Sequence, residues 1–381
     1  MDVQSPARSR GVSMAPRLFT VTFRTDASLA IGTGHAMRCL TLADALASRG
    51  AQCHFICREH PGNLIEHIRR KGHTVHALPQ AESGFSADMQ TPTPIHAHWL
   101  GCDWQTDAAQ TRAILAEKTT DWLIVDHYAL DARWEKALRG NCGKIMVIDD
   151  LADRPHDCDL LLDQNLGRQA TDYDALVPAH CQRLIGPRYA LLRPEFAALR
   201  AYSLQRRRQQ PRLGRILVAM GGVDQPNATG QVLEALKTCP LPPDCRITVV
   251  MGESAPWLDQ VRALAVQMPW PTEVLVNIDN MAQIMADSDL AIGAAGSSSW
   301  ERCCLGLPTL LVVLAKNQEN GVQALCNSGA AKIIGAPELI HKNTREILSD
   351  LLRNNDTNNW SLNAQLLTDG LGSTRVLKNI E

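Results

Sequence analysis

The sequence lacks any long apolar run, any C-x-x-C pair and any H-E-x-x-H motif. Without about 20 consecutive apolar residues, no segment predicts a membrane-spanning helix, and we expect a soluble protein. The 12 cysteines are scattered through expected helices and strands, which favours reduced thiols in a cytoplasmic protein over a disulfide framework. A formal net charge of −2 provides no strong field of either sign, which argues against nucleic acid or an anionic membrane surface as a partner.

The beginning of the chain is small, polar and basic, and it has no apolar segment of the kind that a secretion signal needs. We expect residues 1–16 to form a disordered tail, and Met14 is a candidate for the true start. The remaining length is sufficient for two domains with ordinary cores. The expected parts are a first domain at 17–200, a basic linker at 201–213, a second domain at 214–340 and a C-terminal helical segment at 341–381.

The first expected domain opens with a strand, a Gly-rich loop and a helix, in the order that is typical of a Rossmann-like unit. The β-branched and aromatic content of 17–24 predicts the strand, and apolar residues on one face of 35–48 predict the helix. The loop between them holds Gly32 and Gly34. It does not match the dinucleotide pattern G-x-G-x-x-G, because Met37 occupies the third glycine position.

His35 stands where this loop meets the helix, and so at the carboxyl edge of the expected sheet, where α/β proteins bind ligands. A neutral imidazole there could act as a general base near neutral pH. A histidine that caps the helix or packs against it is an equally open interpretation. Asp126 and Tyr128 end another apolar run, 121–128, and are expected at the same edge, where Asp126 could equally cap a loop or helix.

The second expected domain repeats this plan. The apolar run 214–220 predicts a buried parallel strand, and it leads into a loop that contains Gly221, Gly222, Asp224 and Asn227. Such a loop can present backbone N–H groups to a diphosphate. A simple tight turn is the competing interpretation.

The stretch 277–320 has the features of a nucleotide-binding site. An expected buried strand leads into a turn of small residues that includes Gly296, Ser297 and Ser298, and a helix-like run follows. The unpaired N–H groups at the start of a helix, its dipole and a serine hydroxyl together favour a phosphate. Glu301 in the first turn could accept hydrogen bonds from ribose hydroxyls, or could simply favour the helix N-terminus.

The motifs of this stretch, D-N-M, S-D-L-A-I, A-G-S, W-E, G-L-P and K-N-Q, resemble the C-terminal half of the MurG-type glycosyltransferases. That family has the GT-B architecture, an α/β fold with two Rossmann-like domains whose parallel sheets face each other across a cleft, and it holds UDP-sugars in the C-terminal domain. The resemblance implies that the backbone near Ile278 and Met281 recognises uracil. It also implies that the Gly296–Ser298 turn holds the diphosphate and that Glu301 holds the ribose.

The segment R-T-D-A-S-x-x-I-G-T-G-H-A-M-R-C resembles the PseG family more closely still, and so do I-D-D-L-A-D-R, A-M-G-G-V-D and A-A-G-S-S-S-W-E-R-C-C-L-G-L-P. These proteins are UDP-2,4-diacetamido-2,4,6-trideoxy-β-L-altropyranose hydrolases of pseudaminic acid biosynthesis. In that family the histidine of the G-x-G-H segment is assigned as the catalytic base. The matching residue here is His35, with Arg38 one turn further on, and the likeness extends from Leu18 to about Leu377.

The resemblance implies that water attacks the anomeric carbon with inversion and that UDP and the free sugar are released. The residues expected to act in catalysis are His35, Tyr128 and Asn317. Those expected to bind substrate are Gly32, Gly34, Arg38, Asp126, Arg188, Gly221, Gly222, Asp224, Asn227, Ile278, Met281, Gly296, Ser297, Ser298, Glu301, Gln318 and Asn320. We expect no cofactor and no metal, since the D-x-D triplets at 157–159 and 287–289 favour structural anchoring over a metal site.

Two other functions fit the same sequence. A GT-B glycosyltransferase would use the same histidine to activate an acceptor hydroxyl, and a fold shared by both activities does not decide between them. An exposed apolar or basic stretch, which a membrane-bound acceptor would favour, is not evident. A UDP-sugar-binding protein without turnover is the third interpretation. No residue pattern identifies the sugar ring itself or the oligomeric state.

Overall fold

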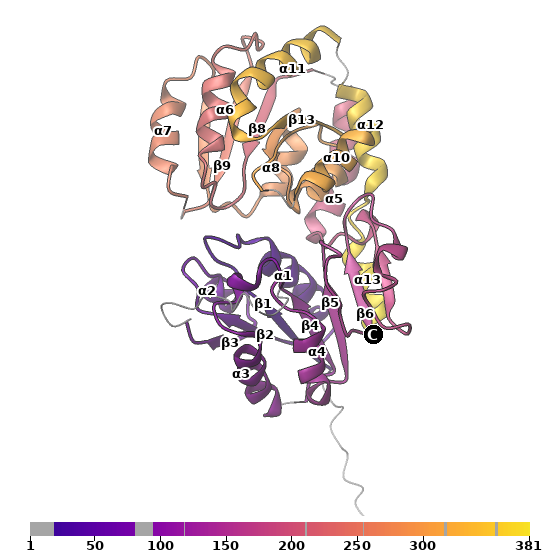
Figure 1. The fold of residues 1–381 in the computed structure, drawn as a ribbon. Coiled ribbons are helices and arrows are strands. Elements are labelled where there is room, and N and C mark those ends of the chain that lie inside the picture. The colour runs from indigo at the N-terminus through magenta and orange to yellow at the C-terminus, as the bar shows by residue number, and fades with distance from the viewer. Residues whose placement is uncertain are drawn as a thin grey trace, which may run out of the picture.

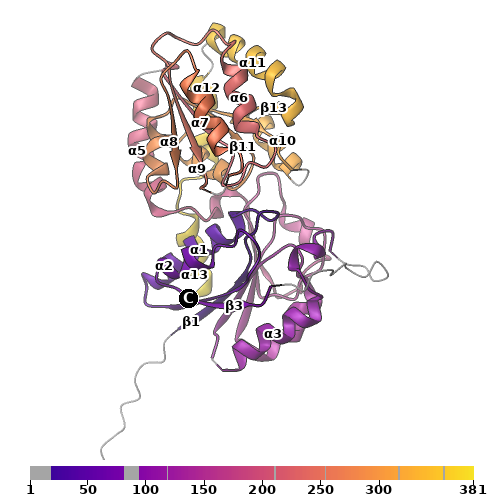
Figure 2. The same ribbon diagram turned by 90° about the vertical axis from the view of Figure 1, so that its left-hand side faces the viewer.

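The protein forms two α/β domains, each built on one parallel sheet, which confirms the predicted fold class. The structure, a computed structural model, describes residues 19–80, 94–117, 119–209, 212–253, 255–315, 318–354 and 357–381. The expected tail at 1–16 lies outside these residues. Figure 1 shows one domain above the other, and the view in Figure 2 shows the same separation from the side.

The N-terminal sheet has seven parallel strands in the order β3-β2-β1-β4-β5-β6-β7. The strands are β1 Thr20–Thr25, β2 Gln52–Arg58, β3 Thr74–Leu78, β4 Trp122–Asp126, β5 Lys144–Ile148, β6 Leu160–Asp163 and β7 Gln182–Ile185. The helices are α1 Gly34–Ala47, α2 Ile65–Arg70, η1 Ala97–Leu100, α3 Trp104–Ala116, α4 Ala132–Leu138, η2 Arg139–Asn141, η3 Ala170–Tyr173 and η4 Pro187–Tyr189. Because strand order reverses beside β1, the carboxyl ends of β1 and β4 meet at a switch point, the usual ligand position in this fold.

The C-terminal sheet has six strands in the order β10-β9-β8-β11-β12-β13, again with its switch point beside the first strand. The strands are β8 Arg215–Ala219, β9 Arg246–Met251, β10 Thr272–Val276, β11 Leu290–Ala294, β12 Thr309–Val312 and β13 Ala331–Gly335. The helices are α5 Pro194–Gln209, α6 Ala228–Leu236, α7 Leu258–Val266, α8 Met281–Asp287, α9 Ser298–Cys304, α10 Glu319–Asn327, η6 Pro337–Leu339, α11 Ile340–Asn354, α12 Thr357–Leu367 and α13 Gly372–Ile380.

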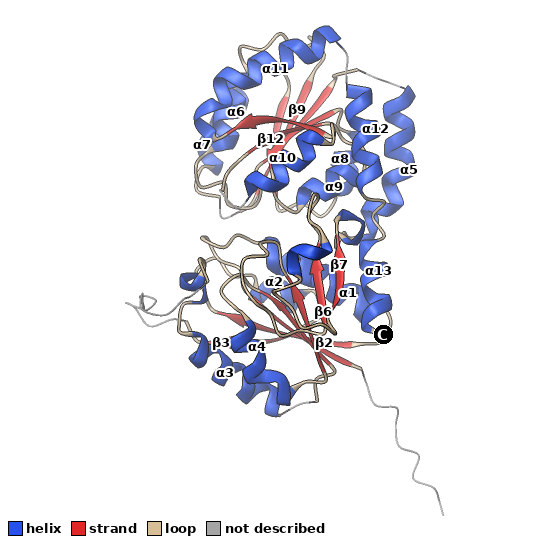
Figure 3. Cartoon of the chain, turned by 45° about the vertical axis from the view of Figure 1, so that its right-hand side comes forward, coloured by secondary structure: helices blue, strands red, loops and turns tan. Residues whose placement is uncertain are grey.

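Both sheets are covered by helices on both faces (Figure 3), which explains the near-continuous apolar strands. Successive residues of β4 show the alternation. Trp122 and Ile124 pack into the core on one face, and Leu123 and Val125 pack into the core on the other. The apolar runs therefore stabilise each domain from two sides at once.

The basic stretch expected as a linker at 201–213 forms the second half of helix α5 through Gln209. This helix packs against α8 and α9 of the C-terminal domain. Arg207 is buried, and its guanidinium donates to the carbonyl oxygens of Met285, Ser288 and Leu305. An arginine-rich sequence is thus a packed helix here, because backbone carbonyls of the neighbouring elements accept its hydrogen bonds.

The C-terminal helix α13 returns to the N-terminal domain after α12 has packed on the C-terminal one (Figure 1). Val376, Leu377 and Ile380 are buried in the same core as β4, and Trp122 Nε1 donates to the Ile380 carbonyl at 2.9 Å. The chain thus crosses between domains twice. None of the helices in the described parts of the chain is long and apolar enough to cross a membrane.

Candidate active site

His35 and Asp126 form a close pair at the carboxyl edge of the N-terminal sheet. His35 is the second residue of α1, and Asp126 is the last residue of β4. The Asp126 Oδ1 atom lies 2.6 Å from His35 Nδ1, and the carboxylate is fully buried. An ionised carboxylate only accepts, so the Nδ1 atom facing it carries the proton and Nε2 is the basic nitrogen of the ring.

Arg38 lies one turn along α1 and clamps the same carboxylate. Its Nε donates to Asp126 Oδ2 at 2.6 Å and its Nη2 donates to Oδ1 at 2.7 Å. Burial alone would raise the pKa of the Asp126 carboxyl, but the charges and hydrogen bonds of Arg38 and His35 outweigh it and hold that pKa well below its ordinary value. The carboxylate therefore stays ionised and keeps the imidazole oriented.

Asp150, which the sequence analysis did not assign to the site, connects Arg38 with Tyr128. It follows β5, at the same sheet edge, and its Oδ2 lies 2.7 Å from Arg38 Nη1. The Tyr128 hydroxyl donates to the same oxygen at 2.7 Å. The rule that placed Asp126 at the sheet edge applies equally to the I-D-D segment and could have identified it.

Tyr128 packs its ring edge-on against His35, with ring centroids 4.5 Å apart. Burial and the adjacent Asp150 carboxylate raise the pKa of the Tyr128 phenol well above its ordinary value. The hydroxyl therefore remains protonated and acts as a hydrogen-bond donor. Of the residues expected at this edge, the structure brings together His35, Arg38, Asp126 and Tyr128.

Two glycine positions show how closely the loops of the two domains approach each other. A Cβ atom on Gly34 would lie 3.8 Å from Ser297 Oγ, and a Cβ on Gly222 would lie 3.7 Å from Thr33 Oγ1. The loop that carries His35 thus faces both Gly-rich loops of the C-terminal domain. His35, the residue after Gly34, therefore lies at the boundary between the two domains.

The loop after β11 exposes Gly296 and Ser297 and leads into α9 at Ser298. Arg302 is buried beneath it. Its guanidinium donates to the Ala294 carbonyl at 2.8 Å and to the Ser298 hydroxyl at 3.2 Å. Arg302 therefore fixes the loop from the protein interior, while Gly296 and Ser297 remain exposed to solvent.

Glu301 is partly exposed in the first turn of α9, next to this loop. Burial raises the pKa of the Glu301 carboxyl, and the charges of Arg193 and Arg302 act in the opposite direction. A partly exposed carboxylate at this position can accept hydrogen bonds from sugar hydroxyls.

The loop after β8 contains Asp224 and Asn227, which were expected to bind substrate but whose side chains bind the backbone of α6 instead. Asp224 is buried and accepts from the backbone N–H groups of Ala228 and Thr229, both at 2.9 Å. Asn227 Oδ1 accepts from Gly230 N at 3.1 Å. Both side chains therefore cap α6, and it is the backbone at Gly222 that approaches Thr33 of the N-terminal domain.

The remaining expected residues are spread around the C-terminal domain and the crossing segment. Ile278 and Met281 are partly buried against the core beneath α8. Gln318 accepts from Leu314 N at 3.1 Å, and Asn320 is exposed on α10. Arg188 is exposed, with its guanidinium over the Tyr189 ring. Asn317 lies outside the described residues, and Gly32, at φ +80°, shapes the loop before α1.

Both D-x-D triplets have structural partners. Arg139 pairs with Asp157 at 2.9 Å and with Asp159 at 2.5 Å. Asp289 accepts from Gly214 N and pairs with Arg206. In the described parts of the chain no group of three or more His, Cys, Asp or Glu side chains is arranged to hold a metal ion.

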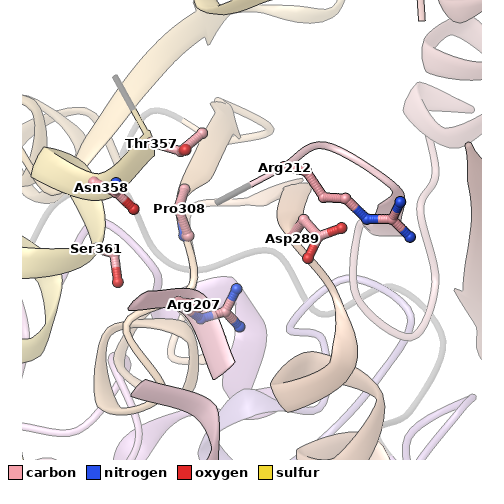
Figure 4. A pocket seen from close by; sticks show the side chains of 7 residues that line it. All are labelled: Arg207, Arg212, Asp289, Pro308, Thr357, Asn358 and Ser361. Atoms are coloured by element: carbon pink, nitrogen blue, oxygen red, sulfur yellow. The ribbon is translucent and has the colours of Figure 1, made fainter. Parts of the chain in front are cut away.

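A small pocket lies away from this site, at the amino ends of β8 and β11 (Figure 4). It is lined by Arg207, Arg212, Asp289, Pro308, Thr357, Asn358 and Ser361. Ligands of parallel α/β sheets bind at the opposite, carboxyl edge. We therefore take the pocket in Figure 4 as a packing feature between α5 and α12.

The chain is similar to known proteins both in sequence and in fold. Residues 216–369 match the glycosyltransferase family 28 C-terminal domain. The chain is 27% identical over 310 residues to a Campylobacter jejuni protein, UDP-2,4-diacetamido-2,4,6-trideoxy-beta-L-altropyranose hydrolase, with 81% of this chain and 97% of that protein covered. It is also 32% identical over 160 residues to the Bacillus subtilis spore coat polysaccharide biosynthesis protein SpsG, covering 42% of this chain and 45% of SpsG.

Among solved structures, Acinetobacter baumannii MurG superposes with a TM-score of 0.67 at 16% identity, with 95% of this chain and 99% of MurG covered. The predicted GT-B architecture is thereby confirmed. The resemblances that the motifs indicated, to PseG and to MurG, are both confirmed as well. The chain is therefore a GT-B protein that is related to the Campylobacter hydrolase and carries a family 28 type of C-terminal domain.

Proposed function

We propose that the protein hydrolyses a UDP-sugar, UDP-2,4-diacetamido-2,4,6-trideoxy-β-L-altropyranose, to UDP and the free sugar. The observation that carries this proposal is the His35–Asp126 pair, held 2.6 Å apart on the N-terminal domain, where His35 follows Gly34, the residue that approaches Ser297 of the C-terminal domain. A base oriented by a buried carboxylate is suited to take a proton from a nucleophile. The name of the Campylobacter relative supports the choice of water and of this sugar.

In the proposed reaction, His35 Nε2 takes a proton from water as the water oxygen attacks the anomeric carbon. The bond from that carbon to the diphosphate oxygen breaks, UDP leaves with the bonding electrons, and the configuration at the carbon inverts. Asp126 stabilises the resulting imidazolium through Nδ1. The Tyr128 hydroxyl donates its one proton to Asp150, so towards the sugar it would accept a hydrogen bond, from a hydroxyl or an amide N–H.

The C-terminal domain would hold the nucleotide. The backbone N–H groups of the loop at Gly296–Ser298 and of the loop at Gly221 and Gly222 would stabilise the diphosphate charge. Glu301 would accept from the ribose, and the backbone near Ile278 would contact uracil. The match to a glycosyltransferase family 28 C-terminal domain over 216–369 supports this assignment.

The test is an incubation of purified protein with this UDP-sugar, in EDTA and without any acceptor, with UDP followed by chromatography. We expect rapid UDP release, and His35→Asn should lose roughly 10²–10⁴-fold in turnover while it still binds UDP. Near-complete activity in His35→Asn would reject His35 as the base. No UDP release by the wild-type protein would reject hydrolysis of this sugar.

The second candidate is a glycosyltransferase that uses the same donor site. The family 28 match and the MurG-like fold favour it. His35 would then deprotonate an acceptor hydroxyl instead of water. UDP release that begins only when an acceptor is added would establish this alternative, and binding of the UDP-sugar without release under either condition would indicate a binding protein.

A further inference from the structure

Two partly exposed aromatic residues extend the ring of Tyr128 away from His35. Trp99 lies nearly parallel to Tyr128, with centroids 5.7 Å apart and an interplanar angle of 22°. His96 packs against both, at 4.3 Å from the Trp99 ring and 5.5 Å from the Tyr128 ring. Since Tyr128 touches His35 at 4.5 Å, these rings form one continuous cluster that begins at the proposed base.

The two outer rings come from a short segment that is not part of the sheet. His96 precedes η1, and Trp99 is its third residue. Both side chains are partly exposed, whereas Tyr128 is only 6% exposed. Large aromatic faces that remain partly open to solvent beside a reactive group are typical of ligand sites.

His96 adds a polar function to this surface. Burial, aided by the charges of His98 and Arg154, lowers the pKa of the His96 imidazole below its ordinary value. The ring is therefore neutral near pH 7, with one nitrogen that donates and one that accepts. An amide group, which has both a donor and an acceptor, is a matching partner.

We propose that His96 and Trp99, which pack against the buried Tyr128 ring, form an aromatic wall that contacts the sugar and favours sugars whose substituents end in methyl groups. An acetamido group would place its methyl against an aromatic face and its amide near His96, and a 6-deoxy carbon would pack in the same way. A hydroxyl-rich hexose would instead lose hydrogen bonds to water on that apolar surface. The proposal rests on the proposed function, because it assumes that the sugar lies beside His35.

The test compares binding of UDP with binding of the intact UDP-diacetamido-trideoxy-sugar by calorimetry, in a His35→Asn background that slows turnover. Adding Trp99→Ala should weaken binding of the sugar nucleotide roughly 10- to 200-fold, the range for removal of an apolar contact from a specific pocket. UDP affinity should stay unchanged, because the loops proposed to hold the nucleotide are on the other domain. Trp99→Phe should retain most of the affinity for the sugar nucleotide, since it keeps an aromatic face.

Trp104 provides the matched control. It is also a partly exposed tryptophan of the N-terminal domain, but its ring lies beneath the Arg133 guanidinium, with 5.7 Å between that group and the ring centroid. Trp104→Ala should leave the affinities for both ligands unchanged. A similar loss in Trp104→Ala and Trp99→Ala would assign the effect to the domain as a whole and overturn the proposal.

A second readout is the preference between substrates in the otherwise wild-type protein. Trp99→Ala and His96→Ala should lower kcat/KM for the diacetamido-trideoxy sugar more than for UDP-glucose. If Trp99→Ala in the His35→Asn background binds the sugar nucleotide as tightly as His35→Asn alone, the proposed contact between the wall and the sugar is disproved. If the wild-type protein releases no UDP, the proposed function fails, and the binding comparison still decides whether the wall contacts the sugar.

Discussion

Replacing Asp126 by asparagine removes the charge that orients His35 while nearly preserving the size of the side chain. The carboxylate accepts from His35 Nδ1 at 2.6 Å and from two Arg38 nitrogens at 2.6 and 2.7 Å. The asparagine amide can donate to Nδ1, which would shift the imidazole proton to Nε2 and remove the basic nitrogen. The variant should therefore lose catalysis even though His35 is still present.

The magnitude follows from the role of the base. A general base contributes about 10²–10⁴-fold, and exchanging an orienting carboxylate for an amide costs up to about 10⁴-fold in kcat. Since Asp126 acts through His35, replacing Asp126 should not lower kcat by more than replacing His35 does. We expect kcat to fall about 10²–10⁴-fold, with UDP affinity unchanged.

Stability should fall as well, because Arg38 is buried. Removing one partner of a buried ion pair costs about 3–5 kcal/mol, and Arg38 retains Asp150 at 2.7 Å, so we expect about 3 kcal/mol from urea unfolding. Asp107→Asn is the matched control. Asp107 is a fully buried carboxylate of the same domain that pairs with Arg24 and Arg58, so its loss should cost similar stability.

The assay is UDP release per folded molecule, with the folded fraction measured by circular dichroism at the assay temperature. Asp107→Asn should retain kcat within a few-fold of the wild type, whereas Asp126→Asn should not. Equal retention of kcat in Asp126→Asn and Asp107→Asn would contradict the role of Asp126 in orienting His35.

Three further predictions concern the fold. Leu377→Ala should lower the free energy of unfolding by about 2–5 kcal/mol in urea titrations, because Leu377 is 1% exposed where α13 enters the N-terminal core, and an unchanged midpoint would contradict that bracing role. Gly293→Ala should cost about 1–3 kcal/mol and weaken UDP binding, since its Cβ would lie 2.7 Å from both the Ala219 carbonyl oxygen and Arg302 Nη1, and wild-type stability and affinity would count against this packing. Burial would raise the pKa of Asp149, but Arg154 and hydrogen bonds lower it from 3.8 to about 2. The ionised carboxylate therefore contributes fully to the free energy of unfolding above pH 3.8, and this contribution is lost as pH falls through about 2. Asp149→Asn should flatten that acid limb of unfolding free energy against pH, and an identical slope would disprove the assignment.

The sequence was sufficient to predict the parts of the site that follow from sheet topology. His35 and Asp126 are 91 residues apart, yet each follows a buried parallel strand, and such strands place their carboxyl ends at one edge. The same rule applies to Asp150, which lies in the I-D-D-L-A-D-R motif, but the motif alone assigned no role to its side chain. Its role depends on the positions of Arg38 and Tyr128, which only the folded chain brings together.

Other features depend on tertiary contacts that leave no local pattern. The arginine-rich stretch before β8 was expected as a basic linker, yet Arg207 is buried, because carbonyls of Met285 in α8 and of Leu305 after α9 accept its hydrogen bonds. Strand β13 was not predicted, since Ala331–Gly335 is short and has two exposed positions. The return of α13 to the N-terminal domain is not readable from its amphipathic pattern, which predicts a partner but does not identify it.

The most direct test of the account is hydrolysis in water enriched in ¹⁸O, without an acceptor, with the products followed by NMR and mass spectrometry. We expect ¹⁸O to enter only the anomeric hydroxyl of the sugar, and the first-formed anomer to have the inverted configuration. Label in the phosphate of UDP would show attack at phosphorus and contradict the assignment of His35 to water at the anomeric carbon. A first-formed anomer of retained configuration would contradict the single direct displacement.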